Sequence, residues 1–120
     1  MKIILYSSIG RELETGIEET LRTLVPEEGV EVYQSLEELA RRLYRLYDNN
    51  VIIILRARDR EELSRIVSLS DLLQGLRVIL FIPDREEETI SLAHRLRPRF
   101  LSNGESDFSD TVGVLRKMIG

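Results

Sequence analysis

Two short stretches of the sequence carry polar side chains that could bind an anion. Residues 7–10 read Ser-Ser-Ile-Gly after one apolar run, and Arg56 and Arg58 follow another. Main-chain amides at the start of a helix can hold a phosphate, hydroxyl groups add donors, and guanidinium groups supply positive charge. We therefore predict a candidate anion pocket made by Ser7, Ser8, Gly10, Arg56 and Arg58.

The same residues also have a simpler interpretation. The two serines would cap the following helix, because a serine hydroxyl can accept from free amides at a helix start. The two arginines would be solvated or would pair with Asp59 and Glu61, their neighbours in the sequence. The loop also lacks the Gly-x-x-x-x-Gly-Lys pattern of nucleotide-binding P-loops. Both interpretations stay open at the level of sequence.

Catalytic and metal-binding chemistry has few candidate residues in this chain. His94 is the single histidine and falls inside a predicted helix, and cysteine is absent. Neither a serine–histidine–acid set nor a histidine cluster can be assembled. The carboxylate run at 86–88 opens a predicted helix, where the positive helix end favours negative charge. We predict no catalytic residue, no metal site and no cofactor, and hence a protein that is not an enzyme.

Five short apolar segments alternate with amphipathic ones along the chain. Residues 51–55 and 78–82 contain no polar side chain, which is typical of central parallel strands covered on both faces. Residues 30–33 contain Glu31 and are followed by Gln34, so they make a better edge strand. The predicted strands are residues 3–6, 30–33, 51–55, 78–82 and 100–101.

Helices are predicted between the strands from apolar residues spaced three and four apart. Ser35 with Glu38, and Asp59 with Glu62, each match a capping box at a helix start. Asp84 with Glu87 repeats that spacing and is predicted to open the fourth helix. The predicted helical segments cover about residues 11–24, 36–46, 59–75, 84–98 and 106–119.

This alternation predicts an α/β protein: a three-layer α/β/α sandwich of five βα units with a parallel sheet in the flavodoxin-like order 2-1-3-4-5. A chain of 120 residues fits a single domain covering residues 1–120. Open sheets of this kind bind ligands where the strands end, at the switch point between strands one and three. The candidate anion pocket falls at that position.

Composition narrows the classes of partner and the location. The net charge is −4, with 21 acidic and 17 basic side chains, so we expect no binding to nucleic acid. The apolar runs are too short for a secretory signal or a membrane span, so we expect no association with a membrane. The absence of cysteine fits a reducing compartment. We predict a cytoplasmic protein.

The length, the fivefold repeat and the all-aliphatic third strand resemble the receiver domain of bacterial response regulators. In that family, acidic residues after strand one and an aspartate ending strand three bind Mg²⁺ and accept a phosphoryl group. A hydroxyl residue after strand four and a lysine after strand five complete the switch. The corresponding positions here hold Ser7-Ser8, Arg56, Ile82-Pro83 and Asn103.

Every switch position thus departs from the family pattern, and the resemblance implies a degenerate, or pseudo-, receiver domain. Asp59 is the nearby carboxylate that a shift in register would make the phosphoacceptor, but its spacing to Glu62 favours a helix cap. We predict a receiver-like signalling or regulatory module that cannot be phosphorylated and acts through protein–protein interaction. The alternative is a small-molecule binding domain that holds a phosphate-bearing ligand or other anion in the candidate anion pocket.

Two surfaces are candidates for protein contacts. Tyr44 and Tyr47, near Arg41 and Arg45, would either form a partner surface, or one of them would pack at the edge of the core while the other shields the arginine stems. The resemblance to receiver domains also implies a homodimer through the fourth helix, the fifth strand and the fifth helix. On that surface, Ile90 and Leu92 flank the inward stripe, and three arginines would face acidic residues of a second copy: Arg95, Arg97 and Arg99.

Overall fold

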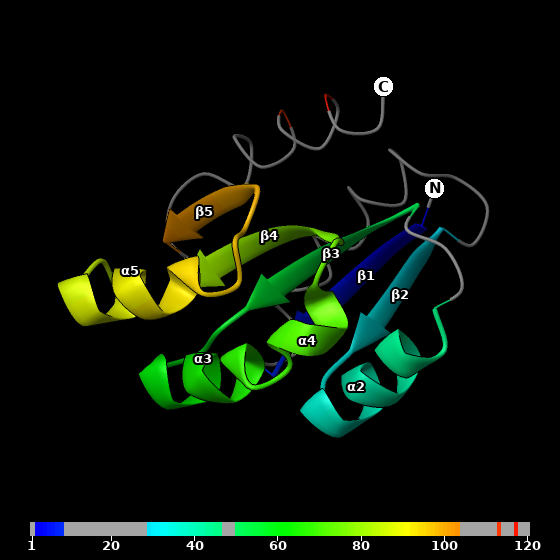
Figure 1. Cartoon of the computed structure of the whole chain (residues 1–120), viewed down its shortest axis with the longest axis horizontal. Helices are drawn as coiled ribbons and strands as arrows, with labels where there is room; N and C mark the ends of the chain where they lie inside the picture. Colours follow the sequence, from blue (N-terminus) through cyan, green and yellow to red (C-terminus); the bar gives the residue numbers. More distant parts are fainter. Residues whose placement is uncertain (1, 9–28, 47–49, 104–112, 114–116, 118–120) are drawn as a thin grey trace.

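The computed structural model describes residues 2–8, 29–46, 50–103, 113 and 117 (Figure 1). They include a parallel five-stranded sheet in the order β2-β1-β3-β4-β5. The predicted α/β fold class, the strand order and all five predicted strands are confirmed. The strands are β1 (Lys2–Ser7), β2 (Val30–Tyr33), β3 (Val51–Arg56), β4 (Arg77–Ile82) and β5 (Phe100–Asn103).

The centre of the sheet is buried on both faces. Ile52, Ile53 and Ile54 of β3 are all 0% exposed, although successive side chains of a strand point to opposite faces. An all-aliphatic strand can occupy only such a position without exposing apolar surface, and β3 lies between β1 and β4 as predicted. By contrast, β2 is an edge strand, and its residues 31–33 are only partly buried.

The described helices pack against one face of this sheet. They are α2 (Leu36–Tyr44), α3 (Arg60–Val67), α4 (Ser70–Leu73) and α5 (Glu87–His94), and Figure 1 shows α2, α3 and α5 side by side along the sheet. Leu39, Ile66 and Ala93 from three of these helices share one core cluster with Ile53. Apart from Gly113 and Lys117, the helices predicted over 11–24 and 106–119 lie outside the described residues. No helix in the described part of the chain is long and apolar enough to cross a membrane.

Two of the predicted helix caps are confirmed. The Ser35 hydroxyl accepts from the main-chain N–H of Glu38 at 3.4 Å, at the start of α2. Asp59 Oδ1 accepts from the main-chain N–H of Glu62 at 2.7 Å, at the start of α3. Each cap satisfies an amide that the helix itself cannot, which is typically worth about 1 kcal/mol.

The prediction of one continuous helix from Asp59 to Gly75 is wrong, because α3 and α4 are separate. The hydroxyl of Ser68 donates back to the carbonyl of Arg65, and the N–H of Leu69 bonds the carbonyl of Ile66 at 2.9 Å, a tighter three-residue spacing. Serine competes in this way with the regular hydrogen bonds of a helix. The break redirects the chain so that Leu73 is buried, with 3% exposed.

The predicted opening of the fourth helix at Asp84 is also corrected. Helix α5 begins at Glu87 and has no side-chain cap, while Asp84 Oδ1 accepts from the N–H of Glu86 at 2.9 Å in the preceding turn. Asp84 therefore forms a local turn two residues too early to cap the helix. The inward placement predicted for Ala93 and Leu96 is confirmed, with exposures of 0% and 7%.

Candidate functional site

The carboxyl ends of the strands bring together the positions that the resemblance to receiver domains singles out. Ser7 is in register with Arg56, and Arg56 with Phe81. Ile82 is in register with Asn103 on the other side of β4. Ser7 is buried and Arg56 is half-buried. These residues therefore share one end of the sheet, as the sequence predicts.

A buried carboxylate that sequence reasoning did not select also lies at this end. Glu62, in the first turn of α3, is 4% exposed. Its Oε2 accepts from the Ser8 hydroxyl at 2.6 Å and from the Tyr6 hydroxyl at 3.3 Å. Its Oε1 accepts from the main-chain N–H of Arg58 at 2.8 Å. Three donors from two neighbouring strand ends thus converge on one carboxylate, a group that we call the Glu62 cluster.

The local fold explains how Glu62 reaches this position. Asp59 fixes the start of α3 by accepting from the N–H of Glu62. Glu62 therefore lies in the first turn of the helix. The last residue of a capping box, three positions after the cap, normally returns its carboxylate to the amide of the cap residue. Here the carboxylate reaches one residue further back, to Arg58, and then across to β1. Burial of an unpaired carboxylate is costly, and these hydrogen bonds offset that cost.

The phenol of Tyr6 is a constant donor in the Glu62 cluster. Burial raises the pKa of Tyr6 to about 12, and the negative charge of Glu62 adds to this increase. Tyr6 is 2% exposed, so water does not compete for its hydroxyl. The hydroxyl therefore stays protonated, and able to donate to Glu62, throughout the physiological pH range.

The structure changes the surroundings of the candidate anion pocket. Ser8 donates to Glu62, so its hydroxyl is engaged by a carboxylate. The Arg58 side chain is 58% exposed and lies 3.4 Å from Asp59 Oδ2, as the simpler interpretation predicts. Gly10 lies outside the described residues. A negative charge therefore stands where the pocket would receive its anion, and the pocket remains a prediction.

The acidic residues near the strand ends do not assemble into a metal-binding group. Within residues 2–8, 29–46 and 50–103, no three or more histidine, aspartate or glutamate side chains lie close enough together to hold a metal ion. Asp59 is occupied as the cap of α3, in agreement with the predicted role. His94 is exposed at the end of α5.

A signal for Glu62 was present in the sequence. The apolar stripe of α3 includes Leu63 and Ile66, which are both 0% exposed. Glu62 precedes Ile66 by four residues, so the two lie on the same face of the helix. A charged residue on a buried stripe needs partners, and Ser8 at the end of the first strand was a candidate donor. The capping pattern already accounted for Glu62, so its second role as a buried hydrogen-bond acceptor was not predicted.

A second cluster with a carboxylate at its centre lies at the edge of the sheet, around Glu31 of β2. Two nitrogens of Arg42 donate to its two oxygens at 2.6 and 3.0 Å, and the Tyr33 hydroxyl donates at 2.6 Å. The ammonium group of Lys2 lies 3.0 Å away. The hydrogen bond from Arg42 is the largest cause that lowers the pKa of Glu31 to about 2. This Glu31 cluster joins β1, β2 and α2.

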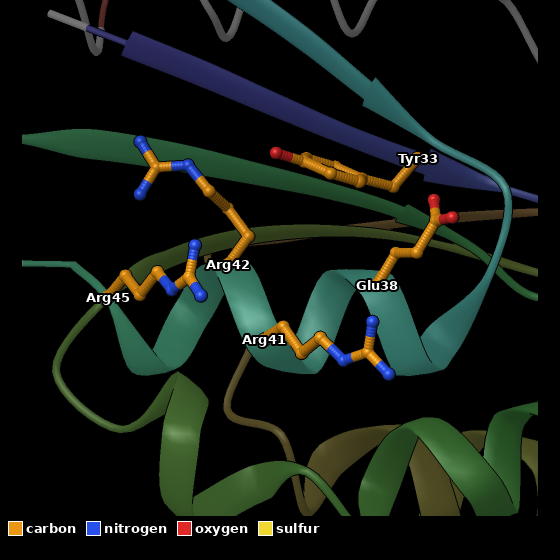
Figure 2. A pocket seen from close by; sticks show the side chains of 5 residues that line it. All are labelled: Tyr33, Glu38, Arg41, Arg42 and Arg45. Carbon is orange, nitrogen blue, oxygen red and sulfur yellow. The ribbon is translucent and has the colours of Figure 1, made fainter.

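A groove of about 200 Å³ lies beside the Glu31 cluster, between α2 and the end of β2. Its lining, shown in Figure 2, consists of Tyr33, Glu38, Arg41, Arg42 and Arg45. Tyr44, the residue before Arg45, is 79% exposed. Tyr44 is therefore not the tyrosine that one of the two predicted alternatives places at the edge of the core. Its predicted companion, Tyr47, lies outside the described residues.

On the opposite side of the helical layer, α5 is tied to α3. Two nitrogens of Arg60 contact the carboxylates of Glu86 and Glu88, the latter at 2.8 Å. The third guanidinium nitrogen donates to the hydroxyl of Thr89, a fully buried residue, at 3.0 Å. The carboxylate run at the start of α5 is therefore partly neutralised by Arg60, in addition to its favourable position at the helix end.

Comparison with known proteins identifies the fold. No protein-family model matches the chain, and no curated protein matches it in sequence. A proposed pilus assembly-related protein of Burkholderia pseudomallei has a similar structure, with a TM-score of 0.72, 19% sequence identity, and coverage of 99% of this chain and 89% of that one. A response regulator in red light signalling of R. palustris is similar too, with a TM-score of 0.63, 13% identity, and coverage of 98% and 91%. The chain therefore has a receiver-like, flavodoxin-like fold over nearly its whole length.

Proposed function

We propose that this chain is a receiver-like regulatory module that takes no phosphoryl group and acts through contacts with protein partners, in the cytoplasm. One observation carries the proposal: Glu62, the buried carboxylate at the strand ends, comes from α3 and already accepts three hydrogen bonds. Ser7-Ser8 and Arg56 stand where a phosphorylated receiver has its acids. In this proposal the chain has the receiver-like fold, while the side chains at the carboxyl ends of its strands have a structural role.

The chemistry of phosphoryl transfer supports this proposal. An aspartyl phosphate forms on an accessible carboxylate beside Mg²⁺, which prefers ligands that include carboxylates. Glu62 is 4% exposed, and its donors would have to be displaced before either oxygen could attack phosphorus. Asp59 uses Oδ1 to cap α3, while its Oδ2 lies near the Arg58 guanidinium. Neither carboxylate is arranged as a nucleophile.

Intact-mass spectrometry after incubation with acetyl phosphate and Mg²⁺ tests the proposal. We expect no covalent phosphate on this chain, while a phosphorylatable receiver domain treated in parallel gains one. Asp59→Asn and Glu62→Gln variants serve as matched controls for the two carboxylates. A phosphate adduct that disappears in either variant would overturn the proposal and identify the acceptor.

The second proposal, a binding domain for a phosphate-bearing ligand or other anion, rests on the register that places Ser7 beside Arg56. The Glu62 carboxylate next to Ser8 argues against it, because like charges repel in a site shielded from water. A thermal-shift screen with inorganic phosphate and nucleotides tests it. Stabilisation that Arg56→Ala abolishes would favour the anion-binding domain over the regulatory module.

The dimer surface belongs to the same proposal of protein contacts. It includes α5 and β5, together with the predicted final helix, which lies mostly outside the described residues. Arg95, Arg97 and Arg99 are exposed on the described part, whereas Ile90 and Leu92 pack against the core. Light scattering tests self-association, and we expect Arg95→Glu to weaken it. A strictly monomeric chain at high concentration would eliminate this surface as a dimer contact.

A further inference from the structure

We propose that the groove between α2 and β2 is a docking site for an acidic segment of a partner protein. This groove, the α2 groove, is lined by Tyr33, Glu38, Arg41, Arg42 and Arg45, and Tyr44, the residue before Arg45, is exposed. This inference rests on the proposed function, since it identifies the surface and the partner chemistry for a module that acts through protein contacts. It concerns the edge of the sheet at β2, far from the predicted dimer surface at β5.

The spacing of the α2 residues creates one polar stripe. Glu38, Arg41, Arg42 and Arg45 are separated by three, one and three residues, so they lie on one side of the helix. Figure 2 shows Glu38 and Arg42 extending upward from the helix toward the level of Tyr33, while Arg41 and Arg45 lie across its near side. The buried residues Leu39 and Leu43 lie on another side of α2 and pack in the core. The stripe is therefore presented on a helix whose position is fixed by the core.

The three guanidinium groups differ in how firmly they are held. Arg42 is tied to Glu31 through two hydrogen bonds and forms a rigid wall of the groove. Arg41 pairs with Glu37 at 2.7 Å, but both side chains are more than two-thirds exposed, and such pairs are easily exchanged for others. Arg45 makes no ion pair with any other described residue. Two cationic groups are thus available to a ligand beside one that is fixed.

The charge of the α2 groove indicates carboxylates as its ligands. Three arginines and Glu38 line the groove; Arg42 and Arg41 are paired with Glu31 and Glu37, so the positive charge left uncompensated among the described residues is that of Arg45, on a chain whose net charge is −4. Guanidinium groups bind carboxylates through paired hydrogen bonds. Arg41 and Arg45 lie one helical turn apart, with Cβ atoms about 6 Å apart. Alternate residues of an extended chain are separated by about 7 Å, so two acidic residues at positions i and i+2 would match them.

Tyr44 favours a protein over other anionic partners. It is the exposed large hydrophobic side chain in the described part of the chain, and tyrosine and arginine are the residues enriched at protein interfaces. A nucleic acid carries a charge on every nucleotide, so its phosphates would extend beyond the groove over a chain whose net charge is −4. A second copy of this chain is a less suitable occupant. The densest acidic run of the chain is residues 86–88, and Arg60 already forms ion pairs with Glu86 and Glu88 of that run. The occupant is therefore an acidic segment of a different protein.

An NMR titration of the isotope-labelled full chain tests the proposal. The probe is a synthetic peptide in which glutamate alternates with leucine and serine, and its matched control carries glutamine in place of each glutamate. We expect the acidic peptide to shift the amide signals of α2 and β2 selectively and the glutamine peptide to leave them unchanged. Shifts confined to another surface, equal shifts with both peptides, or no shifts would overturn the docking site.

Variants of exposed residues make the test specific. Arg45→Glu and Tyr44→Ala change side chains that do not support the core, and we expect Arg45→Glu to weaken peptide affinity about tenfold. Arg85→Glu makes the same charge change before α5 and should leave the affinity unaltered. Equal weakening by Arg85→Glu would show non-specific attraction and refute the site. Self-association lost in Arg45→Glu would replace the acidic partner with a second copy.

The peptide titration and the phosphorylation experiment can fail independently of each other. A phosphate adduct on this chain would overturn the unphosphorylated module, yet peptide binding at the α2 groove would still stand. Conversely, a chain that takes no phosphate and binds no acidic peptide keeps the proposed function and loses only this docking site.

Discussion

Two glutamates in the described part of this chain accept a hydrogen bond from a tyrosine hydroxyl, and their other partners differ. Glu31, at the β2 edge, is bound by Arg42 and Lys2 as well as Tyr33. Glu62, at the carboxyl ends of β1 and β3, receives Tyr6, Ser8 and a main-chain amide, and no ion pair joins it to a cation among the described residues. One cluster is an ionic link between elements, and the other is a buried network of neutral donors.

The contrast shows how the same residue type can stabilise a fold in two physical ways. The Glu31 cluster depends on charge, so it is sensitive to acid and to salt. The Glu62 cluster depends on donors that water cannot reach, so its loss leaves unsatisfied polar groups in the interior. Three measurements test whether the two clusters differ in this way.

The largest effect is expected for Glu62→Ala. Without the carboxylate, the Tyr6 and Ser8 hydroxyls and the Arg58 amide lose their acceptor in a buried position, and we expect a loss of about 3 kcal/mol in the free energy of unfolding. Glu62→Gln retains the side-chain volume and one acceptor oxygen, so its cost is expected to be about 1 kcal/mol. Urea denaturation of both variants measures the difference. Equal costs would mean that these donors find water, and the buried-network interpretation would fail.

An intermediate effect is expected from acid on the Glu31 cluster. The folded pKa of Glu31 is about 2, below its ordinary value of 4.5. Its contribution is therefore complete above pH 4.5 and is lost as the pH falls toward 2; we expect it to be on the order of 2 kcal/mol. The stability difference between the wild type and Glu31→Gln should shrink over that range. A difference that stays constant from neutral to acid pH would contradict the assigned ionic role.

The smallest effect is expected from salt. Arg42→Met removes the main cation from Glu31, and we expect its cost to fall by about 0.5 kcal/mol when sodium chloride is raised to a concentration that screens exposed charges. Tyr6→Phe removes a neutral donor from Glu62, so its cost should not depend on salt. Denaturation of both variants at low and high salt provides the measurement. Equal salt dependence at the two sites would remove the distinction between them.

Much of the fold follows from local patterns in the sequence. The all-apolar residues 51–55 and 78–82 must be buried on both sides, so they had to occupy the middle of the sheet. Ser35 and Asp59 precede helices that need an acceptor at their first turn, and both provide it. The break between α3 and α4 was missed, because the back-bond of Ser68 competes with helical hydrogen bonds in a way that apolar spacing does not reveal.

The strand order and the residues at the carboxyl ends of the strands could be predicted from the sequence, because burial patterns along single elements are local properties. The contacts of those residues became known from the tertiary structure. Ser8 and Glu62 are separated by 54 positions, and Glu31 and Arg42 by 11, so no spacing rule connects them. The parallel crossovers of the fold bring β1 beside the start of α3. Ser8, which was predicted to line an anion pocket, therefore donates to a buried carboxylate.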